Sequence, residues 1–385
     1  MKFPKFDVNC APISMHAKTK QMPDFSTLPS GHRIQKFLFA ALFCAFFALN
    51  VSASGSETGE KAAHEAPHQE AKMDPGKLIM EHIADSHDWH LWGHTSLPLP
   101  VIIYTKSLGL SVFSSGKFNH GHDTYQGFKL NEKNQVIWEN ASNTESIYDL
   151  SITKNVLAMF ISVFTLLFIL LSVASSYKKR PGMAPKGFLN ILEPLILFLR
   201  DDVAKSSIGP KYERFMPLIL SIFFFIFVNN LFGLIPIFPG GANVTGNIAV
   251  TMVLALVVFV TVNVRGTKDY WKHIFLPDVP KAMYLILVPI EILGVILKPF
   301  VLMLRLFANI TAGHIIILGF FSLIFIFGAM SPGLGFAVSP LSVAFTLFMS
   351  FLELLVAFLQ AFVFTLLTAI YIGMAVEEHH HPEHH

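Results

Sequence analysis

The chain has 385 residues, of which 53% are hydrophobic and only 14% are charged, and its formal net charge is +2. This composition is typical of membrane proteins, and the small net charge argues against a nucleic-acid-binding protein. The two cysteines, Cys10 and Cys44, lie in or before a predicted leader, so we expect neither disulfides nor a cysteine-ligated metal in the mature protein.

The predicted leader covers residues 1–53. A polar segment and two basic residues precede the apolar block Phe37–Leu49, and small residues follow it up to Ala53. A basic region, a short apolar core and small residues together are typical of a secretory signal peptide. We therefore expect cleavage near Ala53. The alternative is an uncleaved first span, for which the apolar block is short.

Residues 54–150 form a polar extension that we expect in the periplasm. Alternating short runs separated by turn residues predict a small hairpin or meander. These runs are Pro100–Tyr104, Leu110–Phe113, Gly127–Leu130 and Gln135–Glu139. The histidines of the extension stand at positions 64, 68, 82, 87, 90, 94, 120 and 122. Their spacing matches no standard metal site, so we expect a solvated histidine-rich extension.

The membrane domain is predicted over residues 151–378, and its first span is Val156–Ser175. The following segment, residues 177–214, carries eight Lys or Arg and is therefore predicted to be cytoplasmic. Within it, Gly187–Leu199 has apolar residues at helical spacing. This pattern predicts an amphipathic helix on the membrane surface or packed on neighbouring helices.

Two further spans, Phe215–Ile235 and Asn247–Val264, form a predicted hairpin with an uncharged loop between them. Residues 265–281 carry four Lys or Arg, which predicts a second cytoplasmic segment. The C-terminal tail, residues 379–385, is rich in histidine. We interpret it as solvated; the alternatives are a metal-binding tail and a tag remnant.

Two long apolar blocks follow, Met283–Ala329 and Leu341–Ala375, with the uncharged segment Ser331–Pro340 predicted as the loop between them. Each block is longer than the about 20 residues that a perpendicular span needs. The second block contains one carboxylate, Glu353, which shares a helix face with Gln360. It is a candidate proton-exchanging group, and the alternative is a structural hydrogen bond to the first block.

The first block contains a single arginine, Arg305. Charged groups at membrane depth are costly and mark ion pathways by default. Glu291, Lys298 and Arg305 are seven residues apart and share one helix face, which Asn309 extends, whereas His314 lies about 180° around the helix. The alternative places Arg305 in a turn between two ordinary spans, but turn-forming residues are absent around it.

Three motifs resemble subunit a of the rotary F-type ATP synthase. They are RLFAN at 305–309, LQAFVF at 359–364 and NNLFGLIP at 229–236. The resemblance covers residues 150–378 and implies an all-α membrane protein. Its parts would be one perpendicular helix, a surface amphipathic helix, a transmembrane hairpin and two long tilted helices around a ring of c subunits. The small extramembrane N-terminal extension is not part of the common family pattern.

The resemblance also implies functional positions. With Asn247 added as an inlet-lining residue, the proton-translocation residues are Arg305, His314, Glu353, Gln360, Asn309, Glu291 and Asn247. Arg305 corresponds to the family's essential arginine. Many bacterial members carry glutamate where His314 stands and histidine where Glu353 stands. The swap keeps one acid and one base between the two long helices.

The resulting hypothesis is a non-catalytic stator subunit with two offset half channels, so that ion flow drives ring rotation and ATP synthesis. No catalytic residue, metal or cofactor is expected in this chain. The expected partners are the c-ring subunits, b-type peripheral stalk subunits, the remaining ATP synthase complex and the lipid bilayer of a bacterial inner membrane, with a cytoplasmic C-terminus. The alternatives are a sodium-translocating version, a stand-alone channel or transporter, and a structural membrane anchor.

Overall fold

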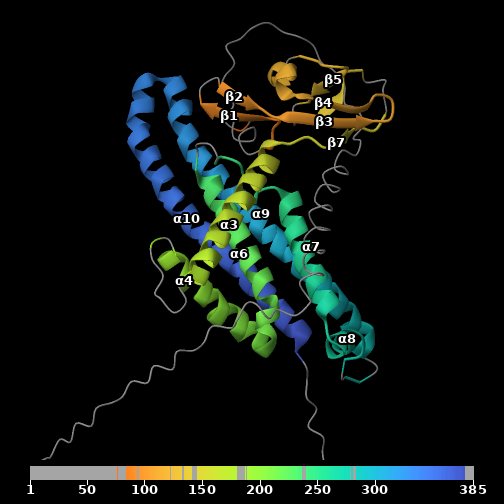
Figure 1. Cartoon of the computed structure of the whole chain (residues 1–385). Coiled ribbons are helices and arrows are strands. Elements are labelled where there is room, and N and C mark those ends of the chain that lie inside the picture. The colour runs from red at the N-terminus through yellow and green to blue at the C-terminus, as the bar shows by residue number, and fades with distance from the viewer. Residues whose placement is uncertain are drawn as a thin grey trace, which may run out of the picture. The chain divides into compact units, whose positions relative to one another are not determined.

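The computed structural model of the chain describes residues 76, 84–92, 95–121, 123–131, 134–140, 145–179, 187, 189–235, 240–277, 279–280 and 283–377. The predicted signal peptide and the histidine-rich tail lie outside these residues. Short strands come first in the described chain, and helices make up the rest (Figure 1).

Five helical segments in the described part of the chain are long and apolar enough to cross a membrane. They are α3 (Lys154–Lys179), the segment Asn190–Leu234 that ends with α6 (Tyr212–Leu234), α7 (Ile248–Arg265), α9 (Tyr284–Met330) and α10 (Pro332–Val376). Each predicted span falls on one of them, so the predicted all-α membrane fold is confirmed. The perpendicular and tilted orientations stay predictions.

Shorter helices connect these segments. They are α4 (Leu189–Phe198), the π-helical η3 (Leu199–Lys205), α5 (Ser206–Ile208), η4 (Gly209–Lys211) and α8 (Lys268–Phe275). The predicted amphipathic helix corresponds to α4, in which Leu192 is buried and Ile191 is exposed. Whether α4 lies on a membrane surface stays a prediction.

The membrane helices share one apolar core. Phe223 and Ile226 of α6 belong to it together with Leu306 of α9 and Phe364 of α10. Small residues bring the backbones close, as is usual between helices in lipid. At Gly373 of α10, an added Cβ would lie 2.0 Å from the carbonyl oxygen of Ser207, so only glycine fits there.

The two longest helices form an antiparallel hairpin with almost no loop. Only Ser331 separates α9 from α10, so the predicted loop Ser331–Pro340 is wrong. The error has a physical reason: Pro332 occupies the first turn of α10, where proline lacks no required hydrogen bond. The hairpin is tight beside this turn, because a Cβ on Gly335 would lie 2.8 Å from Cα of Gly328.

Helix α9 is continuous over its 47 residues, although it contains Pro289 and Pro299. Proline is tolerated in membrane helices where neighbouring groups satisfy the freed backbone. Arg305 therefore lies inside a helix, and the alternative that places it in a turn is wrong.

The strands lie N-terminal to the membrane helices. They are β1 (Asp88–Trp92), β2 (Thr95–Pro98), β3 (Pro100–Thr105), β4 (Gly109–Ser114), β5 (Phe128–Leu130), β6 (Val136–Trp138) and β7 (Tyr148–Asp149), with the 3-10 helix η2 (Ser115–Gly121) after β4. All pairings are antiparallel: β1 with β2, β3 between β4 and β7, and β5 with β6. The predicted hairpins are confirmed as β3–β4 and β5–β6.

We call the described residues from 84 to 153 the β domain. Its core consists of five buried apolar side chains, Val101, Ile103, Phe118, Phe128 and Val136.

The β domain also caps α3. The Asp85 carboxylate accepts hydrogen bonds from the Asn155 backbone N–H (3.1 Å) and the Thr153 hydroxyl (2.7 Å), and Ser86 O accepts one from Lys154 N (2.8 Å). A carboxylate at a helix N-terminus satisfies free N–H groups and complements the helix dipole. The domain and the first membrane helix are therefore joined by hydrogen bonds as well as by the chain.

Candidate functional site

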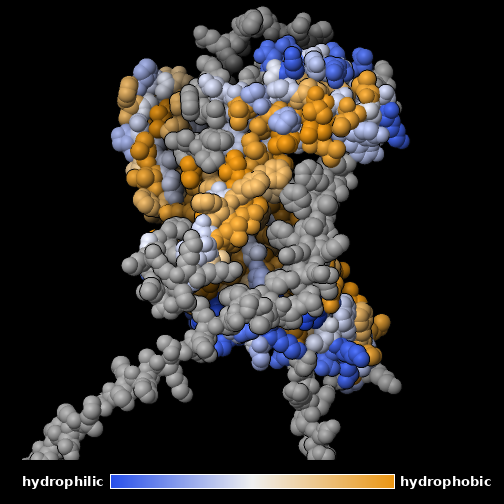
Figure 2. Space-filling model, viewed as in Figure 1, coloured by the Kyte–Doolittle hydropathy of each residue, from blue (hydrophilic) through white to orange (hydrophobic). Residues whose placement is uncertain are grey.

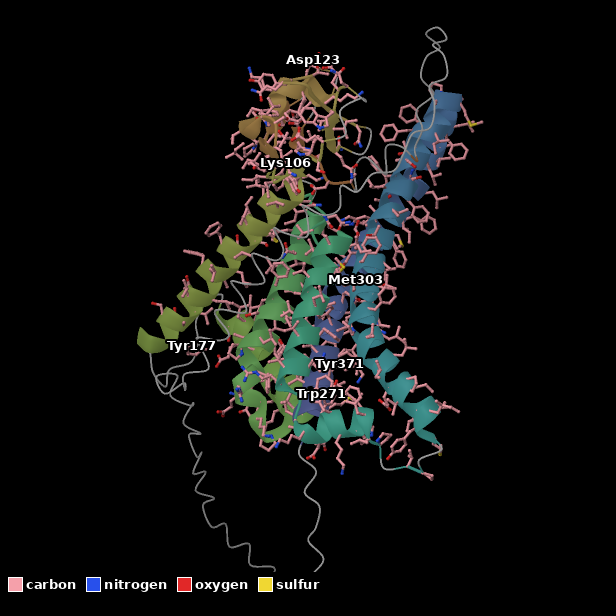
Figure 3. The ribbon with its side chains drawn as sticks, turned by 90° about the vertical axis from the view of Figure 1, so that its right-hand side faces the viewer. Lys106, Asp123, Tyr177, Trp271, Met303 and Tyr371 are labelled. Atoms are coloured by element: carbon pink, nitrogen blue, oxygen red, sulfur yellow. The ribbon has the colours of Figure 1, made fainter. Side chains whose placement is uncertain are left out.

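Side-chain contacts between α9 and α10 follow the antiparallel order of the hairpin. Moving along α10 from Glu353 to Gln360 to Tyr371 leads backwards along α9 from His314 to Asn309 to Lys298. Figure 3 shows Met303 on α9 and, closer to the end of the bundle opposite the β domain, Tyr371 on α10. The polar groups predicted from sequence thus meet across one helix–helix interface.

The His314–Glu353 pair is the most buried acid–base contact of this interface. Nδ1 of His314 lies 2.5 Å from Oε1 of Glu353, and the two side chains are 15% and 4% exposed. The second carboxylate oxygen, Oε2, is buried and has no hydrogen-bond partner among the described residues. A histidine–carboxylate contact of this length can pass a proton between its members, and the free oxygen can receive one from elsewhere.

Two glycines make room for this pair. A Cβ on Gly313 would lie 2.8 Å from Oε1 of Glu353, so a larger residue would displace the carboxylate. A Cβ on Gly233 of α6 would lie 3.6 Å from Nε2 of His314, which shows how closely α6 approaches the ring. Three helices therefore define the position of one acid–base pair.

Asn309 and Gln360 form the next contact. Nδ2 of Asn309 donates to Oε1 of Gln360 at 2.8 Å, whereas the buried Nε2 of Gln360 has no partner among the described residues. Arg305 lies one turn before Asn309 and is exposed in the isolated chain. No described carboxylate forms an ion pair with it. Its guanidinium stays charged at any physiological pH.

Asn230 and Thr245 add buried polar groups that were not among the predicted site residues. The Thr245 hydroxyl donates to Oδ1 of Asn230 at 2.6 Å, and Nδ2 of Asn230 donates to the Ala357 carbonyl of α10 at 3.1 Å. Both side chains are at most 2% exposed. The sequence signal is an amide inside an otherwise apolar helix, which is costly unless it is hydrogen-bonded.

Asn247 caps a helix. Its Oδ1 accepts a hydrogen bond from Ala249 N at 2.9 Å at the start of α7. The nearby Thr251 hydroxyl is buried and donates to backbone carbonyls. Neither side chain hydrogen-bonds to His314 or Glu353, so the structure gives Asn247 a capping role, and a lining role stays a prediction.

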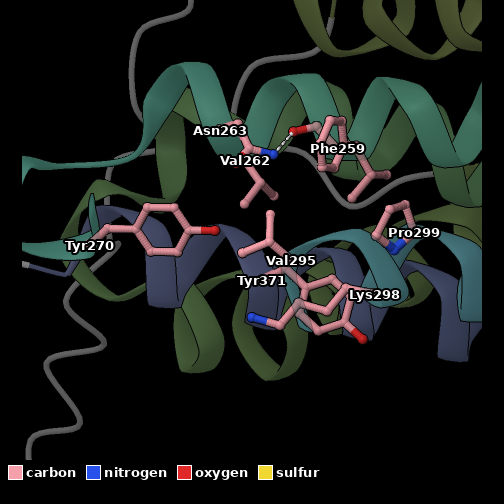
Figure 4. A pocket seen from close by; sticks show the side chains of 9 residues that line it. Phe259, Val262, Asn263, Tyr270, Val295, Lys298, Pro299 and Tyr371 are labelled. Carbon is pink, nitrogen blue, oxygen red and sulfur yellow. Dashed lines mark hydrogen bonds between the residues drawn. The ribbon is translucent and has the colours of Figure 1, made fainter. Parts of the chain in front are cut away.

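A small cavity lies between α7, α8, α9 and α10, on the Lys298 side of the interface (Figure 4). Its polar lining consists of Asn263, Tyr270, Lys298 and Tyr371. The Lys298 ammonium lies 5.5 Å from the centre of the Tyr371 ring, a cation–π distance. Asn263 donates to Phe259 O at 2.7 Å, while its buried Oδ1 has no partner among the described residues.

Glu291 borders the same region. Burial and then the negative charge of Glu291 raise the pKa of the Tyr270 hydroxyl, so the carboxylate lies within electrostatic reach of this cavity-lining residue. The predicted polar face of α9, formed by Glu291, Lys298 and Arg305, therefore lies beside polar groups of α8 and α10.

The histidine prediction for the extension is wrong at His87. This side chain is 4% exposed, and its Nε2 lies 3.5 Å from Oδ2 of Asp149. No local sequence pattern predicts this contact, because the two residues are far apart in the chain. No group of three or more metal-ligating side chains occurs among the residues that the structure describes.

Five long apolar helical segments and a polar interface between the two longest define a multi-pass membrane protein with ionisable groups inside its helices. The chain belongs to the ATP synthase A chain family, whose family model matches residues 156–373. A second model, described as a domain of unknown function (DUF8433), matches residues 78–157, which include the β domain.

Several relatives are named ATP synthase subunit a. The protein of Chloroherpeton thalassium is 46% identical over 240 residues, which cover 61% of this chain and 69% of the relative. The Chlorobium phaeobacteroides protein is 42% identical over 243 residues, 62% of this chain and 68% of the relative. The Myxococcus xanthus protein is 42% identical over 244 residues, 61% of this chain and 77% of the relative.

Proposed function

We propose that this chain is the ion-translocating stator subunit of a rotary ATP synthase and is not catalytic on its own. One observation carries the proposal. Arg305 is an exposed, permanently charged residue on α9, surrounded by exposed apolar side chains such as Val301 and Leu304, and no carboxylate of the described chain pairs with it. A partner with an apolar surface and one carboxylate would cover the exposed apolar side chains around Arg305 and neutralise its positive charge.

The proposed partner at this surface is the ring of c subunits. An ionised c-subunit carboxylate is attracted to Arg305, whereas a protonated one can move into lipid. The fixed positive charge also opposes direct proton flow past this point. Ions then cross only by ring rotation, driven by about 2.3 kcal/mol per charge per 100 mV plus the pH difference.

The His314–Glu353 pair serves the first half channel. The free Oε2 of Glu353 can accept a proton or a hydrogen bond from water, and the free Nε2 of Gln360 can donate a hydrogen bond to water. Asn230 and Thr245 hold the neighbouring backbone with hydrogen bonds of their own. We favour protons over sodium ions because an imidazole and a carboxylate in contact can act as general acid and base and pass a proton between them.

The cavity beside Lys298 and Tyr371 serves the second half channel, with Glu291 at its border. The basic segments around Arg200 and Lys272 support a cytoplasmic location for this side by the positive-inside rule. The N-terminal extension then lies in the periplasm of a bacterial inner membrane, and the C-terminus lies in the cytoplasm. The b-type stalk subunits and the rest of the complex are the remaining partners.

The test is Arg305→Ala in the assembled complex. We expect ATP synthesis coupled to ion flow to fall to background, because the positive charge facing the ring is lost. Arg305→Lys keeps a charge but loses the delocalised guanidinium, and we expect little recovery.

Arg200→Ala is the matched control. Arg200 is half-exposed and paired with Asp201 at 2.8 Å, so its removal should leave synthesis within about twofold of wild type. Normal coupled synthesis in Arg305→Ala would overturn the proposal.

A further inference from the structure

The sheet β4–β3–β7 has one buried face and one free apolar face. Val101 and Ile103 of β3 point into the core of the β domain, while the alternate residue Tyr104 is exposed. Leu110 and Val112 of β4 lie opposite Tyr104 and Ile102 and are 63% and 62% exposed. A contiguous apolar surface of this kind on a folded domain marks a binding face.

Two tyrosines complete this face. Tyr148 of β7 pairs with Tyr104 of β3, and their ring centres are 6.2 Å apart. Tyrosine combines an apolar ring with a polar hydroxyl and is enriched where proteins meet the headgroup layer of a membrane. We call Tyr104, Leu110, Val112 and Tyr148 the free sheet face.

The free sheet face is held close to the N-terminal end of α3. Pairing of β3 continues beyond β7, since Leu150 N donates to Ile102 O (2.8 Å) and Ile152 N donates to Pro100 O (3.1 Å). Helix α3 begins two residues later, at Lys154, and its first turn is capped by Asp85. The sheet is therefore fixed directly beside the end of a membrane span.

Figure 3 places Lys106, in the β3–β4 turn, on the α3 side of the domain and Asp123 on the opposite side.

Helix α3, which Asp85 of the β domain caps, has an exposed apolar surface of its own. Phe164, Leu167 and Phe168 of α3 are exposed apolar residues. Figure 2 shows hydrophobic residues on α3 and on the β domain, and hydrophilic residues along one edge of the domain. We propose that the free sheet face lies on the bilayer surface beside α3, so that the β domain is a lipid-contacting collar of the first span.

The proposal is tested by photocrosslinking in the assembled complex, reconstituted in vesicles of phosphatidylethanolamine and phosphatidylglycerol. The photoreactive residue p-benzoylphenylalanine replaces Leu110 or Val112, and mass spectrometry identifies what each probe captures. We expect phospholipid adducts at both positions, in about fivefold higher yield than at a solvent-facing control, because an interfacial side chain enters the headgroup layer.

Asp123 is the matched control position. It is exposed in the same domain but lies on the side away from α3. Capture of another protein subunit at 110 and 112 would overturn the proposal, and so would a lipid yield equal to that at 123. Neither outcome depends on Arg305 or on the half channels, so the test is independent of the proposed function.

Discussion

The chain contains two histidine–carboxylate contacts, one in the β domain and one between α9 and α10. In the first, His87 is the buried partner at 4% exposure, and Asp149 is 27% exposed. In the second the order is reversed, since Glu353 is 4% exposed and His314 is 15% exposed. The same pair of chemical groups is thus placed in two opposite ways.

The difference lies in how the carboxylate is satisfied. Asp149 also accepts a hydrogen bond from Ser151 N at 2.9 Å. Burial raises the pKa of Asp149, but the nearby His87 imidazole and the hydrogen bonds from Ser151 outweigh burial and lower the pKa overall. Glu353 instead keeps one buried oxygen without a partner among the described residues. Such an oxygen costs about 1–3 kcal/mol, and the buried ring nitrogens of His87 also have no hydrogen-bond partner among the described residues. We propose that the β-domain pair is structural and that the membrane pair transfers protons.

The largest expected effect is a loss of proton pumping when the His314–Glu353 pair is disrupted but not when the His87–Asp149 pair is. Glu353→Ala should reduce proton pumping by the assembled complex by about 100-fold, the usual range for loss of a proton-transfer group. Asp149→Asn should leave pumping within about twofold of wild type. Pumping is measured as ATP-driven acidification of vesicles, and equal losses in the two variants would break the comparison.

A smaller effect tests the geometry of the membrane pair. Gly313→Ala should reduce pumping by about tenfold, because the new Cβ would lie 2.8 Å from Oε1 of Glu353 and would push the carboxylate off His314. Gly319→Ala in the same helix has nothing within 4 Å of its Cβ and is the matched control. Unchanged pumping in Gly313→Ala would show that the close contact is unimportant.

The β-domain pair should act on stability alone. At pH 7, Asp149→Asn should lower the free energy of local unfolding of the β domain by about 1 kcal/mol, measured by hydrogen exchange. Because folding lowers the pKa of Asp149, this contribution is present at neutral pH and is lost as the pH falls below about 4. The prediction would be wrong if the stability difference between wild type and Asp149→Asn increased as the pH was lowered.

The smallest effect concerns Asn247. Asn247→Ala should destabilise the start of α7 by about 1 kcal/mol through loss of its cap, and Asn247→Asp should restore it. If Asn247→Asp restores stability but pumping stays low, the residue lines the inlet as well as capping the helix. Hydrogen exchange at residues 248–251 and vesicle acidification give the two measurements.

Much of the fold could be predicted because long apolar runs admit few structures in lipid. The spans, the β3–β4 and β5–β6 hairpins and the helical position of Glu353 follow from run length and periodicity. The predicted loop after Ser331 failed because an uncharged segment that starts with proline suits a helix start as well as a loop.

The site was predictable as a set of residues but not as a set of contacts. Arg305, His314 and Glu353 attract notice because each is an ionisable group in an apolar block. The role of Gly313 depends on a carboxylate 40 positions away, and the burial of His87 depends on Asp149, which only the folded sheet brings near. Local patterns carry no information about such long-range approaches.

The single residue between α9 and α10 has a further consequence. With Ser331 as the whole connection, neither helix can slide along the other without breaking the turn. One inserted amino acid there would advance α10 by about 1.5 Å and rotate it by about 100°. The three contacts His314–Glu353, Asn309–Gln360 and Lys298–Tyr371 would then be lost together, so the length of this connection sets the alignment of the polar side chains between α9 and α10.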